Sequence, residues 1–532
     1  MKSWRNHWPA LWLLLILAFV AVVRIRLLSL PLERDEGEYA YAGQLMLEGV
    51  PPYRLMYNMK MPGIYAAYAF CMAIFGRSAE GIHFGFMLVN LGCVVMVWFL
   101  GRRFLQPAGA LAAAATFALM SVSPCVQGLN AHATHFVMLA ALGATLALLR
   151  AQESGRLAGF FHSGALFGVA FLMKQPGGAF AFFGLALLLW AAVRQSPPAW
   201  KAHGVRLGIF AAGLAAPVVL TALLLWRAGV WTTFWRWTVT YAGVHATLMP
   251  WSFGSAKLAG YIERLRWDGL FWVLAAAGLA CALKERNRAD GKFFFVTLLL
   301  FSAAAVCPTF HFTDHYFVLM LPVVALLAAK ALDTAAAWEA SRPGATVRWA
   351  PWLLFALAWA GAAWTHRGIF LEWTPAEAAA RVYPVNNFQV YPVIGAYLDQ
   401  HASPGAKIAV LGSEPELMFY ARRRSVTGYI YMYDLVQEQP FRERMVREMT
   451  KEVEQGRPDY FVFVNLTLSW LPDLPESLQR IQRWLEDYTD RLYKPCGVVT
   501  FPPNQYFWGP DCLRRVPPDH RFIILFERKD LP

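Results

Sequence analysis

The chain has 532 residues, of which 57% are hydrophobic and only 16% are charged, and its mean hydropathy is +0.38. Soluble domains carry about 25% charged residues, so this composition excludes an ordinary soluble protein and indicates an integral membrane protein. The formal net charge of +13 does not indicate a nucleic-acid partner, because most basic residues before the C-terminal part fall in short loops between apolar runs, where they mark topology.

Apolar runs of spanning length predict a polytopic α-helical domain with about eleven transmembrane helices. The first run is too long for a signal peptide and lacks a cleavage site of small residues, so we expect a retained anchor. The spans are predicted at residues 9–30, 80–100, 107–124, 132–149, 158–173, 177–193, 206–226, 268–283, 293–308, 315–332 and 349–366.

Basic residues set the predicted topology, because cytoplasmic loops carry an excess of Lys and Arg. With the N-terminus inside, these loops hold Lys2, Arg5, Arg102, Arg103, Arg150, Arg156, Arg194, Lys201, Arg206, Lys284, Arg286, Arg288, Lys292, Arg342 and Arg348. The segment Pro62–Gly76 is short for a span, and counting it as one would invert all later loops, so we expect an interfacial or re-entrant helix. An odd number of spans then puts the C-terminal part outside a bacterial inner membrane.

Residues 367–532 have the composition of an ordinary soluble domain. We therefore expect a transmembrane domain at 1–366, with outer-face interfacial helices at about 36–76, and an exported α/β domain at 367–532. Its strands are predicted at Lys407–Leu411, Tyr460–Val464, Val498–Phe501 and Phe522–Phe526, and its helices at Val393–His401, Phe441–Gln455 and Ser477–Tyr488. An oxidising compartment permits a disulfide between Cys496 and Cys512, which the spacing alone leaves open.

A charged segment, Arg34-Asp35-Glu36-Gly37-Glu38, follows the first apolar run directly. Charges are unfavourable in hydrocarbon, so this segment marks a site at the water boundary. Either Asp35 and Glu36 act in chemistry, or Asp35 caps the following helix and forms a capping box with Glu38. The capping box leaves the other charges beside the span unexplained.

Two lysines stand out in the predicted outer loops. Lys60 precedes a helix that begins with Pro62, where a lipid phosphate would lie. Lys174 is a basic residue on the outer side, against the general trend, and indicates an anionic partner. The alternative for each lysine is that it only snorkels to the interface.

Histidines and one aspartate also gather in outer turns, where they are candidates for metal or sugar binding. Their spacing matches no strong metal motif, and polar residues that cap helices in a wet turn are the alternative. These residues are His132, His135, His245, His311, Asp314 and His315.

No charged series runs through the predicted membrane interior, as proton- or ion-coupled transporters usually have. This favours an enzyme at the outer interface. The alternatives are a transporter or flippase of lipid-linked sugars, which moves lipid without cleaving a bond, and a non-catalytic envelope assembly protein.

The order of these residues resembles the membrane glycosyltransferases of the GT-C fold, specifically the dolichyl-phosphate-mannose protein mannosyltransferase-like group (glycosyltransferase family 39), which includes the lipid A aminoarabinose transferase. The resemblance covers about residues 9–332 and rests on Asp35-Glu36 with Tyr39-Ala40, Lys60-Met61-Pro62, Lys174-Gln175, and His315-Tyr316 followed by Leu321-Pro322. In the tail, Val410–Glu416 and Tyr420–Arg423 look like the corresponding segments of bacterial members.

The resemblance implies a polyprenyl-phosphate-linked sugar as donor, transfer to a hydroxyl of a protein, lipid or glycan at the outer leaflet, and inversion at the anomeric carbon. It implies Asp35 as the base, with Glu36 beside it. Cations would stabilise the departing lipid phosphate: Arg54, Lys60 and Lys174. Contacts to the substrate are expected from Tyr57, His132, His135, His311, Asp314 and His315.

A metal site is doubtful on the same resemblance. In the aminoarabinose transferase an acidic residue precedes the lysine that matches Lys60 and helps bind a metal, but Met59 stands here. His245 falls roughly where the family's other metal ligand would. Two alternatives therefore stay open: no cofactor, or a divalent metal ion. The second acidic position of the family is missing as well, and His132 or His135 is the substitute.

Overall fold

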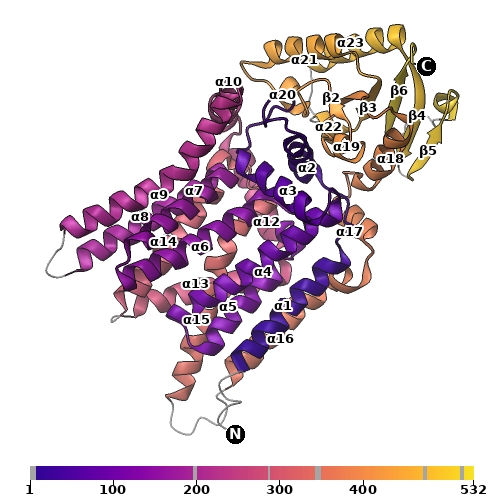
Figure 1. Cartoon of the computed structure of the whole chain (residues 1–532). Coiled ribbons are helices and arrows are strands. Elements are labelled where there is room, and N and C mark those ends of the chain that lie inside the picture. Colours follow the sequence, from indigo (N-terminus) through magenta and orange to yellow (C-terminus); the bar gives the residue numbers. More distant parts are fainter. Residues whose placement is uncertain are drawn as a thin grey trace.

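The computed structural model describes residues 8–195, 200–285, 288–341, 349–470, 476–501, 503–515 and 521–531. The N-terminal part is a bundle of long helices, and a smaller domain with a β-sheet lies at one end of it (Figure 1). Five of the basic residues used for the predicted topology lie outside the described residues: Lys2, Arg5, Arg286, Arg342 and Arg348.

All eleven predicted spans are helical, because only helices satisfy backbone hydrogen bonds within a single apolar segment. The helices of this part are α1 (Trp8–Arg26), α2 (Arg34–Leu47), α3 (Pro62–Phe75), α4 (Ala79–Phe104), α5 (Pro107–Met120), α6 (Ala133–Ser154), α7 (Leu157–Met173), α8 (Gly178–Arg194), α9 (Trp200–Arg227), α10 (Trp231–Trp235), α11 (Ala242–His245), α12 (Trp251–Arg264), α13 (Gly269–Lys284), α14 (Ala289–Val306), α15 (Leu321–Ala340) and α16 (Ala350–Thr365).

Among the described residues, eight helical segments are long and apolar enough to cross a membrane by length and composition. Three further predicted spans, α5, α7 and α16, are shorter, with 14, 17 and 16 residues. The segment α3, predicted as interfacial, also has 14 residues and is about 21 Å long at 1.5 Å per residue. That is less than the roughly 30 Å of bilayer hydrocarbon.

The C-terminal domain is the α/β domain that the sequence predicts, and each predicted strand and helix is present. Its helices are α17 (Pro375–Val382), α18 (Tyr391–His401), α19 (Glu416–Tyr420), α20 (Tyr433–Val436), α21 (Arg442–Gly456), α22 (Thr467–Trp470) and α23 (Glu476–Leu492). Its strands are β1 (Lys407–Leu411), β2 (Arg424–Ser425), β3 (Tyr460–Asn465), β4 (Tyr493–Phe501), β5 (Gln505–Trp508) and β6 (Arg521–Arg528). They form one mixed sheet in the order β2-β1-β3-β6-β4-β5.

The short helices α2 and α3 lie between the bundle and the C-terminal domain (Figure 1). One buried apolar cluster joins them to the strands of the domain. At the closest approach, a Cβ atom added to Gly37 would lie 2.5 Å from the Cβ atom of Glu416, so only glycine permits this contact. Arg34 forms a 3.0 Å ion pair with the buried carboxylate of Glu414. The domain therefore fixes the position of α2.

Candidate active site

Helix α2 begins at a capping box, but with different residues from those that the sequence suggests. Glu33 is the N-cap, its side chain accepts the N–H of Glu36 at 2.9 Å, and the Glu36 carboxylate accepts the N–H of Glu33 in return at 3.2 Å. The capping box of Asp35 with Glu38 is therefore wrong, because the helix starts two residues earlier than that interpretation needs. Asp35 and Glu38 are left free for other contacts.

Glu36 anchors α2 to the bundle. Its carboxylate is fully buried and accepts hydrogen bonds from the Asn130 amide at 2.8 Å and the Ala131 N–H at 2.5 Å, and it pairs with the His83 ring at 3.0 Å. Burial raises the pKa of Glu36, but the His83 ring and these donors outweigh it and hold the pKa below its usual value. Both oxygens are thus occupied by structural contacts.

The free face of α2 meets Lys60. Asp35, Glu38 and Tyr39 share this face because residues three and four apart lie together on a helix. The Lys60 ammonium lies 2.8 Å from the Asp35 carboxylate, 3.5 Å from that of Glu38 and 3.1 Å from the Tyr39 hydroxyl. Burial raises the pKa of Asp35, yet nearby charges, above all that of Lys60, lower it to about 2. Asp35 is therefore a carboxylate at any physiological pH.

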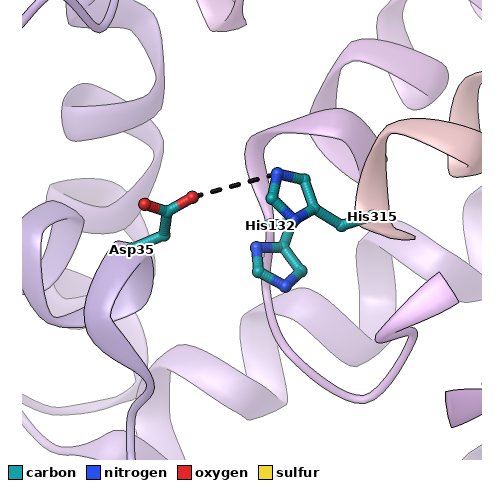
Figure 2. Close-up of side chains that lie close together, drawn as sticks. All are labelled: Asp35, His132 and His315. Atoms are coloured by element: carbon teal, nitrogen blue, oxygen red, sulfur yellow. Dashed lines mark ion pairs between the residues drawn. The ribbon is translucent and has the colours of Figure 1, made fainter. Parts of the chain in front are cut away.

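Two histidines, His132 and His315, also lie beside Asp35 (Figure 2), and His315 contacts a second cation, Lys174. The Asp35 carboxylate is 3.9 Å from Nε2 of His315, and the same nitrogen is 3.3 Å from the Lys174 ammonium. The ring of His132 stacks on that of His315, with 4.0 Å between the centroids. Asp35 comes from α2, His132 from the turn before α6, Lys174 from the turn after α7 and His315 from the turn before α15. We refer to Asp35, Lys60, His132, Lys174 and His315 as the Asp35 cluster.

Burial shifts the proton affinities of this cluster. It lowers the pKa of Lys174 to about 7, with a further decrease from Lys60. It lowers the pKa of His132 to about 4, so that ring is neutral near pH 7. The pKa of Glu38 rises to about 7, because burial outweighs the neighbouring charge of Lys60. Near neutral pH, the cluster therefore holds one firm ion pair and one lysine that is half charged.

Only one acidic side chain facing Lys60 is accessible. The Asp35 side chain is 24% exposed, whereas that of Glu38 is fully buried and accepts hydrogen bonds from the hydroxyls of Tyr65 at 2.6 Å and Tyr431 at 3.1 Å. A partly accessible carboxylate beside one ammonium group, with a second across His315, can accept a proton while the cations bind an anion.

The cluster can also offer three metal ligands. One atom each of Asp35, His132 and His315 lies within 4.8 Å of the others, and both ring nitrogens of His132 are buried without a hydrogen-bond partner. However, the ammonium group of Lys60 already contacts Asp35, and that of Lys174 contacts His315. One ammonium group and a second lysine that is half charged near neutral pH thus contact the donor atoms that a metal ion would need, so the donor set fits an anion better than a metal ion.

The predicted metal ligand His245 lies elsewhere. Its ring stacks on His311 at 5.0 Å, and among the described residues it belongs to neither group of three potential metal ligands. In the C-terminal domain, Cys496 and Cys512 are both buried and free, so the structure does not contain the disulfide, which stays a prediction.

Four other predicted site residues have their contacts away from the Asp35 cluster. Arg54 is exposed and donates to the carbonyl of Ala228. Tyr57 stacks on Trp237 and donates to Glu452 of the C-terminal domain at 3.1 Å. His311 binds Thr309 within its own turn, and Asp314 forms an ion pair with Arg264. His135, by contrast, is buried one helical turn beyond His132, against the ring of Phe86.

Two residues beside the cluster are not among the predicted site residues, although Tyr316 belongs to the His315-Tyr316 motif. The Tyr316 ring lies 4.0 Å from the Lys174 ammonium, and the Gln127 amide oxygen lies 3.2 Å from Nδ1 of His315. Gln127 has a φ of 49°, a left-handed conformation that is uncommon for a residue other than glycine. A strained backbone is seen only in the structure, so an isolated glutamine in a loop could not be selected.

The sequence and fold match known glycosyltransferases. Residues 59–226 match the family model described as dolichyl-phosphate-mannose-protein mannosyltransferase. No curated protein sequence matches the chain. The fold matches ArnT from Cupriavidus metallidurans in the apo state with a TM-score of 0.58 at 16% identity, covering 97% of each chain.

Two further solved structures share the fold. One is ArnT from the same organism bound to undecaprenyl phosphate, with a TM-score of 0.55, 18% identity, and coverage of 87% of this chain and 95% of that one. The other is the oligosaccharyltransferase AglB of Archaeoglobus fulgidus in complex with an inhibitory peptide and a dolichol-phosphate, with a TM-score of 0.56, 13% identity, and coverage of 97% and 75%. The predicted resemblance is thus confirmed: this multi-pass chain has the fold of the GT-C glycosyltransferases, and its residues 59–226 match the mannosyltransferase family.

Proposed function

We propose that the protein is an inverting glycosyltransferase that moves a sugar from a polyprenyl-phosphate donor to an acceptor hydroxyl at the outer face of a membrane. The observation that carries the proposal is the partly exposed carboxylate of Asp35, which pairs with the Lys60 ammonium at 2.8 Å and also interacts with the charge of Lys174. The structures of ArnT with undecaprenyl phosphate and of AglB with a dolichol-phosphate support a lipid phosphate as ligand.

In the proposed reaction, the lipid phosphate binds Lys60 and Lys174. The acceptor oxygen attacks the anomeric carbon, the bond from that carbon to the phosphate oxygen breaks, and the acceptor proton moves to Asp35. The lysines stabilise the phosphate that leaves as an anion. Inversion needs one base and no carboxylate nucleophile. This agrees with the complete burial of Glu36 and Glu38.

Substrate binding would also activate the base. A base with a pKa of about 2 accepts protons poorly at neutral pH, since the best catalytic pKa lies near the working pH. Nearby opposite charges lower a carboxyl pKa by about 1–3 units. When the donor phosphate draws Lys60 away from its 2.8 Å contact, the pKa of Asp35 rises toward its ordinary value. The resting ion pair thus keeps the base inactive until the donor arrives.

The proposed place of the reaction follows from topology. Helix α2 packs against the C-terminal domain, and His132, Lys174 and His315 gather beside its residue Asp35, so the cluster lies at the end of the bundle where that domain is attached. The basic loops at the other end favour a cytoplasmic position for that end, and hence a periplasmic or extracellular domain of a bacterial inner membrane. Membrane lipids surround the spans, and the acceptor is a protein, lipid or glycan hydroxyl.

The test uses the purified full chain in lipid nanodiscs with a polyprenyl-phosphate-linked hexose labelled in the sugar. We expect Asp35→Asn to lower transfer by about 10²–10⁴-fold, the usual contribution of a general base. The control Glu263→Gln removes an exposed acidic side chain from α12 and should transfer normally. If Asp35→Asn keeps wild-type transfer while its melting temperature is unchanged, Asp35 is not the base.

The same assay separates the alternatives. A transporter would move the labelled lipid across the membrane without releasing free polyprenyl phosphate, and an assembly protein would do neither. Proton NMR of the product gives the anomeric configuration. Retention of configuration would rule out the single displacement.

A further inference from the structure

A groove of about 970 Å³ lies between α4, α6 and α7, far from the Asp35 cluster. It is lined along α4 and α6 by small and apolar side chains: Gly92, Val95, Met96, Gly143, Leu146 and Ala147. Such a volume is at the upper end of ordinary ligand pockets, which enclose about 300–1,000 Å³. On a membrane-spanning surface, an apolar groove accommodates hydrocarbon chains.

The length of the groove corresponds to one leaflet. On α4 its lining runs from Gly92 to Arg103, and on α6 from Gly143 to Ser154, so the two end residues are eleven positions apart on each helix. At 1.5 Å per residue this is about 16 Å, close to half of the roughly 30 Å hydrocarbon thickness. A lipid that occupies it would have its head group at the helix ends and its chains in the same leaflet.

Basic side chains surround that end of the groove. Arg103, Arg150, Arg156 and His162 are all part of the lining. Arg103 already pairs with Glu153, whereas Arg150 and Arg156 have no acidic partner among the residues that the structure describes. Arg150 lies near the end of α6 and Arg156 directly precedes α7, so only the turn at Gly155, with a φ of 70°, separates the two helix ends that carry them. The positive charges of the two arginines are thus not neutralised by a described acidic side chain.

We propose that this groove binds an anionic glycerophospholipid from the leaflet opposite the C-terminal domain. The two arginines would contact the phosphate and the apolar lining would hold the acyl chains, as basic pockets between transmembrane helices do for anionic head groups. A polyprenyl phosphate has the same anionic group, but its chain is much longer than one leaflet, so we assign the groove to the diacyl lipid.

The lipid would brace the helices that hold the Asp35 cluster. Helix α4 carries His83, which contacts Glu36; α6 begins directly after His132; and α7 ends directly before Lys174. A ligand wedged between the far ends of these three helices restricts their relative motion. This bracing role, unlike the lipid binding itself, rests on the proposed glycosyltransferase function.

Native mass spectrometry of the delipidated full chain tests the binding, with dioleoylphosphatidylglycerol and dioleoylphosphatidylcholine as probes of equal chain length. We expect the first lipid to be retained preferentially. In the double variant Arg150→Gln/Arg156→Gln the preference should fall about 30-fold, since each arginine near a lipid surface contributes roughly a fivefold factor. The matched control Arg194→Gln/Arg288→Gln removes two exposed arginines outside the groove and should retain the preference.

A second variant tests the shape of the groove independently of charge. A Cβ atom at Gly143 would meet Leu166 and Met96 only at ordinary contact distance, 3.6 Å, so Gly143→Leu should fold and fill the groove. It should lower retention of both lipids. Equal retention of the two lipids by the wild type, an equal loss in the control variant, or displacement of phosphatidylglycerol by undecaprenyl phosphate would overturn the proposal.

The bracing is tested by sugar transfer in nanodiscs with and without phosphatidylglycerol. We expect wild-type transfer to rise several-fold with this lipid and the double variant not to respond. If the double variant loses lipid binding but still responds like the wild type, the bracing is wrong. If no variant transfers sugar at all, the proposed function fails while the binding measurement stands.

Discussion

Replacing Lys174 by arginine should remove the fall in donor use on the alkaline side of neutral pH. Burial, with the neighbouring charge of Lys60, lowers the pKa of Lys174 to about 7. Above that pH the lysine loses the charge that we assign to binding the donor phosphate. Arginine stays protonated at any accessible pH, so the variant keeps the charge.

The size of the effect follows from the pKa. With a pKa of about 7, roughly 10% of Lys174 is charged at pH 8 and about 1% at pH 9. The kcat/KM for the donor reports the free enzyme, so it should fall about tenfold and about a hundredfold below its plateau at these two pH values. In Lys174→Arg it should stay nearly constant over the same range, although its plateau is lower because the planar guanidinium replaces a compact ammonium.

The assay is steady-state transfer from a polyprenyl-phosphate-linked sugar in nanodiscs between pH 5.5 and 9.5 at constant ionic strength, on the order of 0.15 M. A second group complicates the profile, because burial also raises the pKa of Glu38 to about 7, and its ionisation would repel the phosphate. The isosteric variant Glu38→Gln is therefore measured in parallel. If the alkaline fall persists unchanged in Lys174→Arg and disappears in Glu38→Gln, the assignment to Lys174 is refuted.

Three further outcomes are expected. Gly37→Ala brings a Cβ atom to 2.5 Å from that of Glu416, so it should lower stability by about 1–3 kcal/mol and reduce transfer, whereas Gly208→Ala meets no atom within 4 Å; thermal unfolding of both variants checks this. Glu36→Gln should lower the melting temperature above pH about 4.3, where an ionised Glu36 contributes fully. The pKa of Glu36 is lowered in the folded chain, so this contribution is lost as the pH falls through the folded value, and the two proteins should converge in acid. Treatment with a strong chelator should leave transfer unchanged, because the ammonium groups of Lys60 and Lys174 contact Asp35 and His315 in the place that a metal ion would take. Complete loss of transfer that is restored by a divalent cation would contradict this.

The helical spans and the strands of the C-terminal domain could be predicted because local patterns determine them. An apolar segment in a bilayer must form its own hydrogen bonds, so hydropathy alone indicates a helix. In β1, Lys407 is exposed and the next four residues are buried, a β-branched and apolar run typical of a covered strand. The short β2, with two residues, has no such pattern and was not predictable.

The residues of the Asp35 cluster could be predicted one by one, since each is a polar residue at the end of an apolar helix. Their pairing could not, because Asp35 meets His315 through tertiary contacts 280 positions along the chain. Proximity in sequence also misleads here. Arg54 and Tyr57 are close to Lys60 in the sequence, yet their contacts are with Ala228 and Glu452, away from the cluster.

The contact between α2 and the C-terminal domain has a consequence for biogenesis. Arg34 leaves the ribosome early, and its partner Glu414 follows 380 residues later. At about 5–20 residues per second, this corresponds to roughly 20–80 s during which α2 has only its contacts with the bundle, including those of Glu36. A truncated chain that ends after α16 would contain every predicted span and the Glu36 contacts of α2, but it would lack the Arg34–Glu414 ion pair and the close contact of Gly37 with Glu416. Completion of synthesis thus supplies the last contacts that position the helix carrying Asp35.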